Sequence, residues 1–269
     1  MNELQQCEFE LLKVFTEICD QLQLRYFLVC GTALGAVKYQ GFIPWDDDVD
    51  VALLREDYEV FIREAPRLLP EHIFLQNHQT ERQSPIIFSK LRNSNTTYIE
   101  KTAAKLPVHH GVYIDIFPLD GYPVKKAAAR RFELKKLLYS KILVALYIQP
   151  TRFKTLLAMP LRLLGVRKWY PYITDRYIAL IKKYPCEGSA LLCNHGNWQG
   201  KLEYAPREQY GDGTTASFEG LRVTVPENYD AYLTQKYGDW RADLPESERV
   251  GHHYFAVCDL EKPYTYYIN

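Results

Sequence analysis

The sequence has 269 residues, of which 47% are apolar (A, V, I, L, M, F, W, Y, C) and 25% charged, proportions that are ordinary for a globular protein with a real core. Its 33 basic and 33 acidic residues cancel, a balance that argues against nucleic acid as a partner. The N-terminus lacks a basic-then-apolar signal pattern, and no run of about 18 apolar residues occurs, so the sequence predicts neither secretion nor a membrane span. The six cysteines show no metal-binding spacing; we expect reduced thiols and a cytoplasmic protein.

In the first quarter of the chain, helical and extended patterns alternate. Apolar residues recur at helical spacing at the N-terminus, and short β-prone runs follow. We predict helices over 2–24, 32–38 (opened by Thr32 as N-cap) and 56–69, strands over 26–30 and 48–54, and a turn over 41–45.

The next block predicts strands over 73–76, 86–91, 98–100 and 112–117, closed by Pro118 and an Asp120-Gly121 turn. Together these elements predict an α+β fold, a mixed sheet flanked by helices, over residues 1–123.

Residues 124–184 form a basic helical insertion, broken by prolines. Between Lys125 and Lys183 stand 15 basic and two acidic residues, a net charge of +13, so the rest of the chain carries −13. This asymmetry indicates an anionic surface as a partner. Residues 185–269 contain a hairpin around 218–221 and a helix over 229–237, and we expect them to complete the core domain.

Four carboxylates crowd the stretch from Asp46 to Asp50. On a strand, Asp46, Asp48 and Asp50 would project from one face. Their mutual repulsion requires a cation nearby, and hard oxygen ligands suit Mg²⁺ with substrate phosphates.

Other interpretations of this acidic run are a solvated loop, a Ca²⁺ loop and the acidic motif of sugar-nucleotide glycosyltransferases. Apolar residues after the acids argue against a solvated loop. The Ca²⁺ loop requires Gly at its sixth position and Glu at its twelfth, where this chain has Val51 and Asp57. The glycosyltransferase motif stays open.

Two further features suit phosphate and metal binding. Gly31-Thr32, between a strand and a helix, would present backbone N–H groups to a phosphate. Asp115 stands in an apolar strand, where a lone carboxylate is costly unless a cation pairs with it. We interpret it as a third metal-site carboxylate; the alternative is a buried Asp paired with a neighbouring Arg.

These residues together resemble the LicD family of bacterial phosphocholine transferases, which is related to fukutin and the fukutin-related protein. The resemblance lies in GTALGAVKYQGFIPWDDDVDVALLREDYEVF (31–61), KLRNSNTTYI (90–99), GVYIDIFPLDGYP (111–123) and FEGLRVTVPENYDAYLTQKYGDW (218–240). It covers about a third of the chain, and the basic insertion carries no family motif.

The resemblance implies a nucleotidyltransferase-like core in which a Gly-Thr turn and three carboxylates hold Mg²⁺, or Mn²⁺ in its place, against a nucleotide. By position, Gly31 and Thr32 would bind phosphate. Asp48, Asp50 and Asp115 would be catalytic and bind the metal; Asp46 and Asp47 exceed the minimum of the superfold, and we add Asp46 to the candidate ligands.

The family also implies Mg²⁺-dependent transfer of phosphocholine from CDP-choline to a sugar hydroxyl of a lipid-linked teichoic acid or lipopolysaccharide precursor, with release of CMP. Lys90 and Arg92, two apart on a predicted strand, are the best phosphate-binding candidates. Aromatic faces attract quaternary ammonium groups, so Trp45, Tyr113, Tyr237 and Trp240 are candidate choline contacts.

His252 is a further candidate substrate contact, although a structural role is equally compatible with a His pair near a C-terminus. The basic insertion, with its leucines, could rest on the inner face of an anionic plasma membrane; a helical subdomain with a solvated basic face is the competing interpretation. The alternative functions are a nucleotidyltransferase or glycosyltransferase with another activated donor, and a protein that binds nucleotide or metal without turnover.

Overall fold

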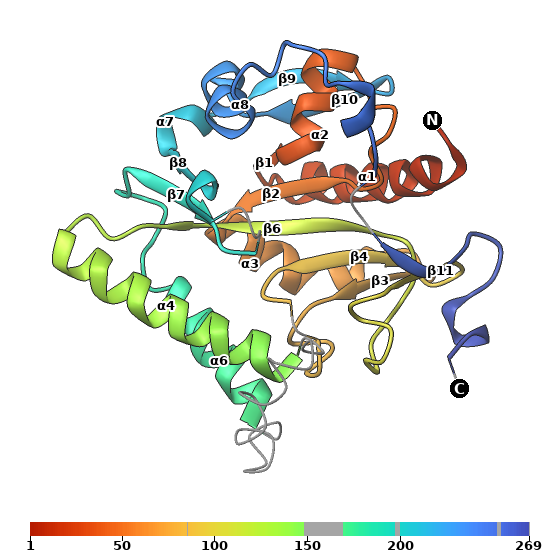
Figure 1. Cartoon of the computed structure of the whole chain (residues 1–269), viewed down its shortest axis with the longest axis horizontal. Helices are drawn as coiled ribbons and strands as arrows, with labels where there is room; N and C mark the ends of the chain where they lie inside the picture. The colour runs from red at the N-terminus through yellow and green to blue at the C-terminus, as the bar shows by residue number, and fades with distance from the viewer. Residues whose placement is uncertain (85, 148–168, 197–199, 252–253, 269) are drawn as a thin grey trace.

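Strands between residues 26 and 206 share one mixed sheet in the computed structural model, which describes residues 1–84, 86–147, 169–196, 200–251 and 254–268. Within these residues, seven strands form the sheet, in the order β1-β2-β6-β4-β3, with β7 paired to β6 and β8 paired to β7. Among the strands that the structure describes in this sheet, β2 and β6 pair in parallel and the other pairs are antiparallel. The prediction of an α+β fold with a mixed sheet is therefore confirmed (Figure 1).

The sheet strands are β1 (Tyr26–Leu28), β2 (Asp50–Leu54), β3 (Ile73–Gln76), β4 (Ser89–Asn93), β6 (Tyr113–Gly121), β7 (Leu191–Asn194) and β8 (Tyr204–Pro206). Two further pairs lie outside it, β9 (Thr214–Phe218) with β10 (Leu221–Val225), and β5 (Thr97–Glu100) with β11 (Phe255–Asp259). The β9–β10 pair confirms the predicted hairpin.

The helices are α1 (Glu3–Leu22), α2 (Cys30–Leu34), α3 (Arg55–Glu64), α4 (Lys126–Tyr147), α6 (Tyr170–Ile181), α7 (Arg207–Tyr210) and α8 (Tyr229–Tyr237). Gly35–Tyr39 continues α2 as a π-helix, and short 3₁₀ turns occupy Ala65–Arg67, Gly200–Glu203, Glu246–Glu248 and Tyr264–Tyr266. The predicted helices at 2–24 and 229–237 are confirmed.

Helices α1 and α3 cover one face of the sheet. The Phe15 ring of α1 packs 5.2 Å from the Phe61 ring of α3, both fully buried. Helix α3 is also tied to β6 by a buried ion pair, in which the Arg55 guanidinium donates to both Asp120 oxygens at 2.7 Å. Successive residues of a strand point to opposite faces of the sheet. Asp120 of β6 points toward α3, so Asp115, five residues earlier on the same strand, lies on the opposite face.

Helices α4 and α6 pack together (Figure 1), around a small core of Phe132, Leu143, Tyr170, Tyr177 and Ile181. The division into core, basic insertion and C-terminal part stays a prediction, although β7 and β8 place residues 191–194 and 204–206 in the same sheet as β6. None of the helices in the described part of the chain combines the length and apolarity needed to cross a bilayer.

Three local predictions are wrong. The first strand ends at Leu28, and the second begins at Asp50 instead of residue 48. Strand β6 does not stop at Pro118 but runs to Gly121. Along one edge of β6, pairing with β4 ends at Ile116 and pairing with β7 starts at Leu119. Pro118 lies between these two pairings, where neither neighbouring strand needs a backbone N–H from it.

Candidate active site

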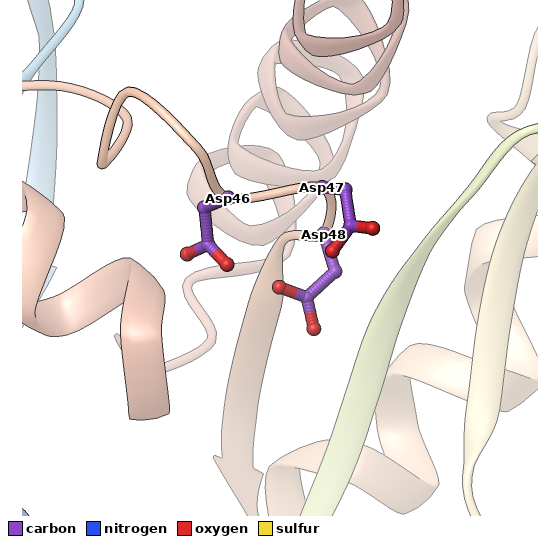
Figure 2. A group of neighbouring side chains, drawn as sticks. All are labelled: Asp46, Asp47 and Asp48. Carbon is purple, nitrogen blue, oxygen red and sulfur yellow. The ribbon is translucent and has the colours of Figure 1, made fainter. Parts of the chain in front are cut away.

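The loop before β2 carries three neighbouring carboxylates. Asp46, Asp47 and Asp48, here called the acidic loop, are half-buried, and each offers an oxygen within 4.8 Å of the others. The Asp46 and Asp47 carboxylates lie apart along the loop, with the Asp48 carboxylate between them (Figure 2). The expected strand alternation of Asp46, Asp48 and Asp50 is thus wrong, but the loop still gathers its acids.

Asp50 and Asp115 lie side by side below this loop. They are register partners on the parallel strands β2 and β6, so their side chains share a face, and both are buried. Burial raises the pKa of Asp50 well above its usual range, and the charges of Asp48 and Asp115 raise it further. Burial also raises the pKa of Asp115, although the Lys90 ammonium opposes this. Two buried carboxylates are thus held next to the acidic loop.

Helix α2 positions two of these acids. Thr32 is not the N-cap that the sequence indicated, because the helix begins at Cys30 after Val29. The Thr32 hydroxyl instead accepts a hydrogen bond from the Asp50 N–H at 2.8 Å. A Cβ added at Gly31 would lie 2.8 Å from Asp46 Oδ2, so the absence of a side chain lets that carboxylate pack against the helix. A direct contact of Gly31 and Thr32 with phosphate stays a prediction.

The cations predicted on β4 face the same side of the sheet. Lys90 is the register partner of Asp115, and its Nζ lies 3.1 Å from Asp115 Oδ1 and 3.6 Å from Glu100 Oε2. The Arg92 guanidinium is buried and donates to Gln76, to the Gly111 carbonyl and to Glu100. Arg92 is therefore engaged in the protein's own contacts, and a phosphate-binding role for either cation stays a prediction.

Glu100 on β5 completes this ionic cluster. Burial alone would raise the pKa of Glu100, but the charges of Lys90 and Arg92 outweigh it and lower the pKa to about 2. Tyr113 lies beneath both cations, with Lys90 Nζ 3.3 Å from its ring centroid, and its hydroxyl donates to Glu100 at 3.1 Å. With its face covered and its ring buried, Tyr113 is poorly placed for choline, and that assignment stays a prediction.

Aromatic residues flank the acidic loop. Trp45 immediately precedes it, half-buried, with the Arg249 guanidinium 5.3 Å from its ring centroid. Tyr237 at the end of α8 keeps 38% of its surface exposed. The pKa of Tyr237 is raised by burial of its hydroxyl and by the neighbouring Cys30 and Asp50. The influence of Asp50 indicates that this ring lies near the site. Trp240 is buried, with its Nε1 donating to Asp230.

His252 and His253 lie outside the described residues. The preceding Gly251 is described, and a Cβ added there would lie 2.6 Å from Asp47 Oδ2. The segment before the His pair therefore reaches the acidic loop.

Sequence reasoning missed Glu8. It lies on α1, is 3% exposed, and burial followed by the charges of Asp48 and Asp47 raises its pKa well above the usual range. A signal was present, because position 8 falls on the helical stripe of Leu4, Leu11 and Phe15, where a carboxylate interrupts an apolar face.

The donor set fits a divalent cation. Three loop carboxylates within 4.8 Å and a buried pair beside them supply the oxygen ligands that Mg²⁺ and Mn²⁺ prefer. Asp115 Oδ1 is buried and has no hydrogen-bond partner, and its closest cation is the Lys90 ammonium. A cation would relieve the repulsion that raises the carboxyl pKa values here.

The mixed sheet carries carboxylates on two neighbouring strands beside a short glycine-containing helix, the arrangement that we expected of a nucleotidyltransferase-type domain. Residues 23–130 match the family model described as LicD/FKTN/FKRP, nucleotidyltransferase domain, and the chain carries a LicD-family domain. It is 28% identical to the lipopolysaccharide cholinephosphotransferase LicD of Haemophilus influenzae, over 94% of this chain and 96% of that protein. Uncharacterized proteins of Rickettsia prowazekii and Rickettsia typhi are each 41% identical over 49 residues, 18% of this chain and 18% and 16% of theirs.

Proposed function

We propose that this protein transfers phosphocholine from CDP-choline to a hydroxyl of a lipid-linked lipopolysaccharide or teichoic acid precursor and releases CMP. The observation that carries the proposal is the buried pair Asp50 and Asp115, in register beneath the acidic loop. The end-to-end similarity to a protein named as a lipopolysaccharide cholinephosphotransferase supports the choice of phosphocholine as the transferred group and of lipopolysaccharide as an acceptor.

We assign the divalent cation, Mg²⁺ or Mn²⁺, to Asp46, Asp48, Asp50 and Asp115. When bound, it would neutralise the diphosphate and stabilise the charge that develops on the departing CMP.

The protein's own residues prepare the acceptor. In the proposed displacement, the acceptor oxygen forms a bond to the phosphorus that carries choline, and the bond from that phosphorus to the bridging oxygen breaks, so CMP leaves with the electron pair. The acceptor proton passes to Asp115, whose carboxylate the Lys90 ammonium holds at 3.1 Å. Thr32 fixes the start of β2 through the Asp50 N–H and so orients Asp50.

The choline headgroup needs an aromatic face, and Tyr237 offers the most accessible ring near the acids. Trp45 is the second candidate, since it adjoins the acidic loop. The nearby carboxylates also favour a quaternary ammonium over a neutral headgroup.

Helix α4 supports contact with an anionic membrane surface at the site of the acceptor. Its outward side exposes Leu134, Leu137 and Leu138 at helical spacing. Exposed basic residues flank these leucines: Arg130, Arg131, Lys135 and Lys141. Leucines beside basic side chains suit the headgroup region of a bilayer, where each cation contributes about 1 kcal/mol. The leucines predicted at 156–164 for the same surface lie outside the described residues.

We place the protein in the cytoplasm, at the inner face of the plasma membrane. None of the six cysteines, all within the described residues, forms a disulfide, as a reducing compartment favours. The alternative function, a nucleotidyltransferase or glycosyltransferase with another activated donor, shares the acidic site and differs in its donor.

The test is release of CMP from CDP-choline with Mg²⁺ and a lipid-linked glycan acceptor. We expect turnover that Asp50→Asn abolishes while circular dichroism stays unchanged, and that the exposed control Asp239→Asn retains. Turnover with a nucleoside triphosphate or nucleotide sugar alone would favour the alternative. Full activity of Asp50→Asn would contradict the assignment of the site.

A further inference from the structure

Glu8 faces the acidic loop from outside the family domain, which begins at residue 23. It lies in the second turn of α1 and is 3% exposed, although its helix carries exposed acids such as Glu10. Burying a carboxylate is costly unless a hydrogen bond or a cation compensates. The surroundings of Glu8 therefore have to supply one of these.

The first turns of α1 are fastened to the acidic loop. Gln5, three residues before Glu8 and on the same side of the helix, donates from Nε2 to the Asp46 carbonyl at 2.9 Å and to the Ile43 carbonyl at 3.4 Å. The Gln5 side chain also accepts from the Asn2 N–H, closing a capping box. These Gln5 side-chain hydrogen bonds hold the start of α1, which carries Glu8, against the loop.

Two buried polar atoms in this region have no hydrogen-bond partner. They are Glu8 Oε2 and the hydroxyl of Tyr98, which is 2% exposed. After burial, the charges that act most on the Tyr98 hydroxyl are those of Asp47 and Glu8. The same charge effects place Glu8, Tyr98 and Asp47 near one another, and Glu8 and Tyr98 each keep one buried oxygen without a hydrogen-bond partner. Buried groups of this kind are typical of a site that takes a ligand.

We propose that Glu8 is a further ligand of the divalent cation at the acidic loop, reaching it from the Asp47 side, directly or through one bound water. The inference rests on the metal site of the proposed function. It adds to that site a carboxylate from α1, so that a helix outside the family domain takes part in cation binding. Tyr98 is a positioning residue, whose hydroxyl donates to the Glu8 carboxylate once the cation orders it.

The test compares Glu8→Gln with the matched control Glu10→Gln, which changes an exposed acid on the same helix. Titration calorimetry with Mn²⁺ alone, on the full chain without substrate, measures the affinity. We expect Glu8→Gln to weaken Mn²⁺ binding at least tenfold, equivalent to about 1.4 kcal/mol, and Glu10→Gln to leave it within twofold.

Thermal unfolding gives a second, activity-free readout. In metal-free buffer, Glu8→Gln should melt no lower than the wild type, because the amide keeps the size of the buried side chain and carries no charge to bury, and Mn²⁺ should stabilise the variant less than the wild type. Glu8→Asp, which keeps the charge but shortens the side chain, should bind Mn²⁺ with intermediate affinity.

Wild-type Mn²⁺ affinity in both Glu8→Gln and Glu8→Asp would overturn the role of Glu8 and leave the metal site of the proposed function intact. An absence of Mn²⁺ binding by the wild type would overturn the metal site itself, and the inference with it.

Discussion

Replacing Lys90 by Met tests the ionic cluster that supports Asp115. Lys90 is 4% exposed, and its ammonium lies between Asp115 Oδ1 at 3.1 Å and Glu100 Oε2 at 3.6 Å. Methionine fills similar volume without the charge, so the substitution leaves two buried carboxylates facing each other with little change in packing.

The magnitude follows from these distances. At an effective dielectric constant of about 20, the 3.1 Å pair is worth about 5 kcal/mol in gross Coulomb energy. Desolvation of the lost ammonium offsets part of this, and breaking a buried ion pair typically costs about 3–5 kcal/mol. We expect Lys90→Met to lower the free energy of unfolding by about 3 kcal/mol at pH 7.

Urea denaturation at pH 7 and pH 5 measures this effect. Without Lys90, the pKa values of Asp115 and Glu100 rise in the folded variant, so the variant regains stability as the carboxyls take up protons, and the difference from wild type shrinks at pH 5. The exposed control Lys105→Met should stay within about 0.5 kcal/mol of wild type. A loss below about 1 kcal/mol for Lys90→Met, or one equal at both pH values, would refute the reasoning.

Three further outcomes are expected. The pKa of Glu100 falls from its ordinary 4.5 to about 2 in the folded protein, so the ionised side chain contributes about 3 kcal/mol to the free energy of unfolding above pH 4.5, and this contribution is lost as the pH falls toward 2. Glu100→Gln should therefore flatten this part of the acid-denaturation curve. An unchanged curve would contradict the prediction. Gly31→Ala should lower Mn²⁺ affinity several-fold, because its Cβ would displace Asp46; calorimetry showing wild-type affinity would exclude that contact. The chain should sediment with anionic vesicles at low salt, and Leu134→Ser with Leu138→Ser should weaken this binding at unchanged CMP release; equal binding to neutral vesicles would remove the membrane proposal.

The sequence predicted the regular elements best. Helical periodicity located α1 and α8, and the Glu219-Gly220 turn located the β9–β10 hairpin. These signals are local, since each depends on residues within a few positions. Predictions that depended on the pairing of strands far apart in sequence failed. The sequence around Pro118 predicts the end of a strand, and only the pairing of β6 with β4 and then with β7 shows why the strand continues.

The residues of the candidate site also divide into those that local sequence patterns identified and those that depend on distant contacts. Asp50 and Asp115 were identified from their own strands, and the register between β2 and β6 brings them together. We expected the carboxylates of the acidic loop to lie on an extended strand, but strand β2 begins only at Asp50. Glu8 and Glu100 were missed because their roles depend on contacts with residues far away in sequence, such as Asp47 for Glu8 and Lys90 for Glu100.

The most direct test of the central claim is a crystal structure with Mn²⁺ and CDP-choline, using the anomalous signal of manganese. We predict a manganese peak bounded by Asp48, Asp50 and Asp115, with the diphosphate of the donor bound to it. A peak elsewhere, or a bound donor with Asp115 turned away from Asp50, would contradict the account.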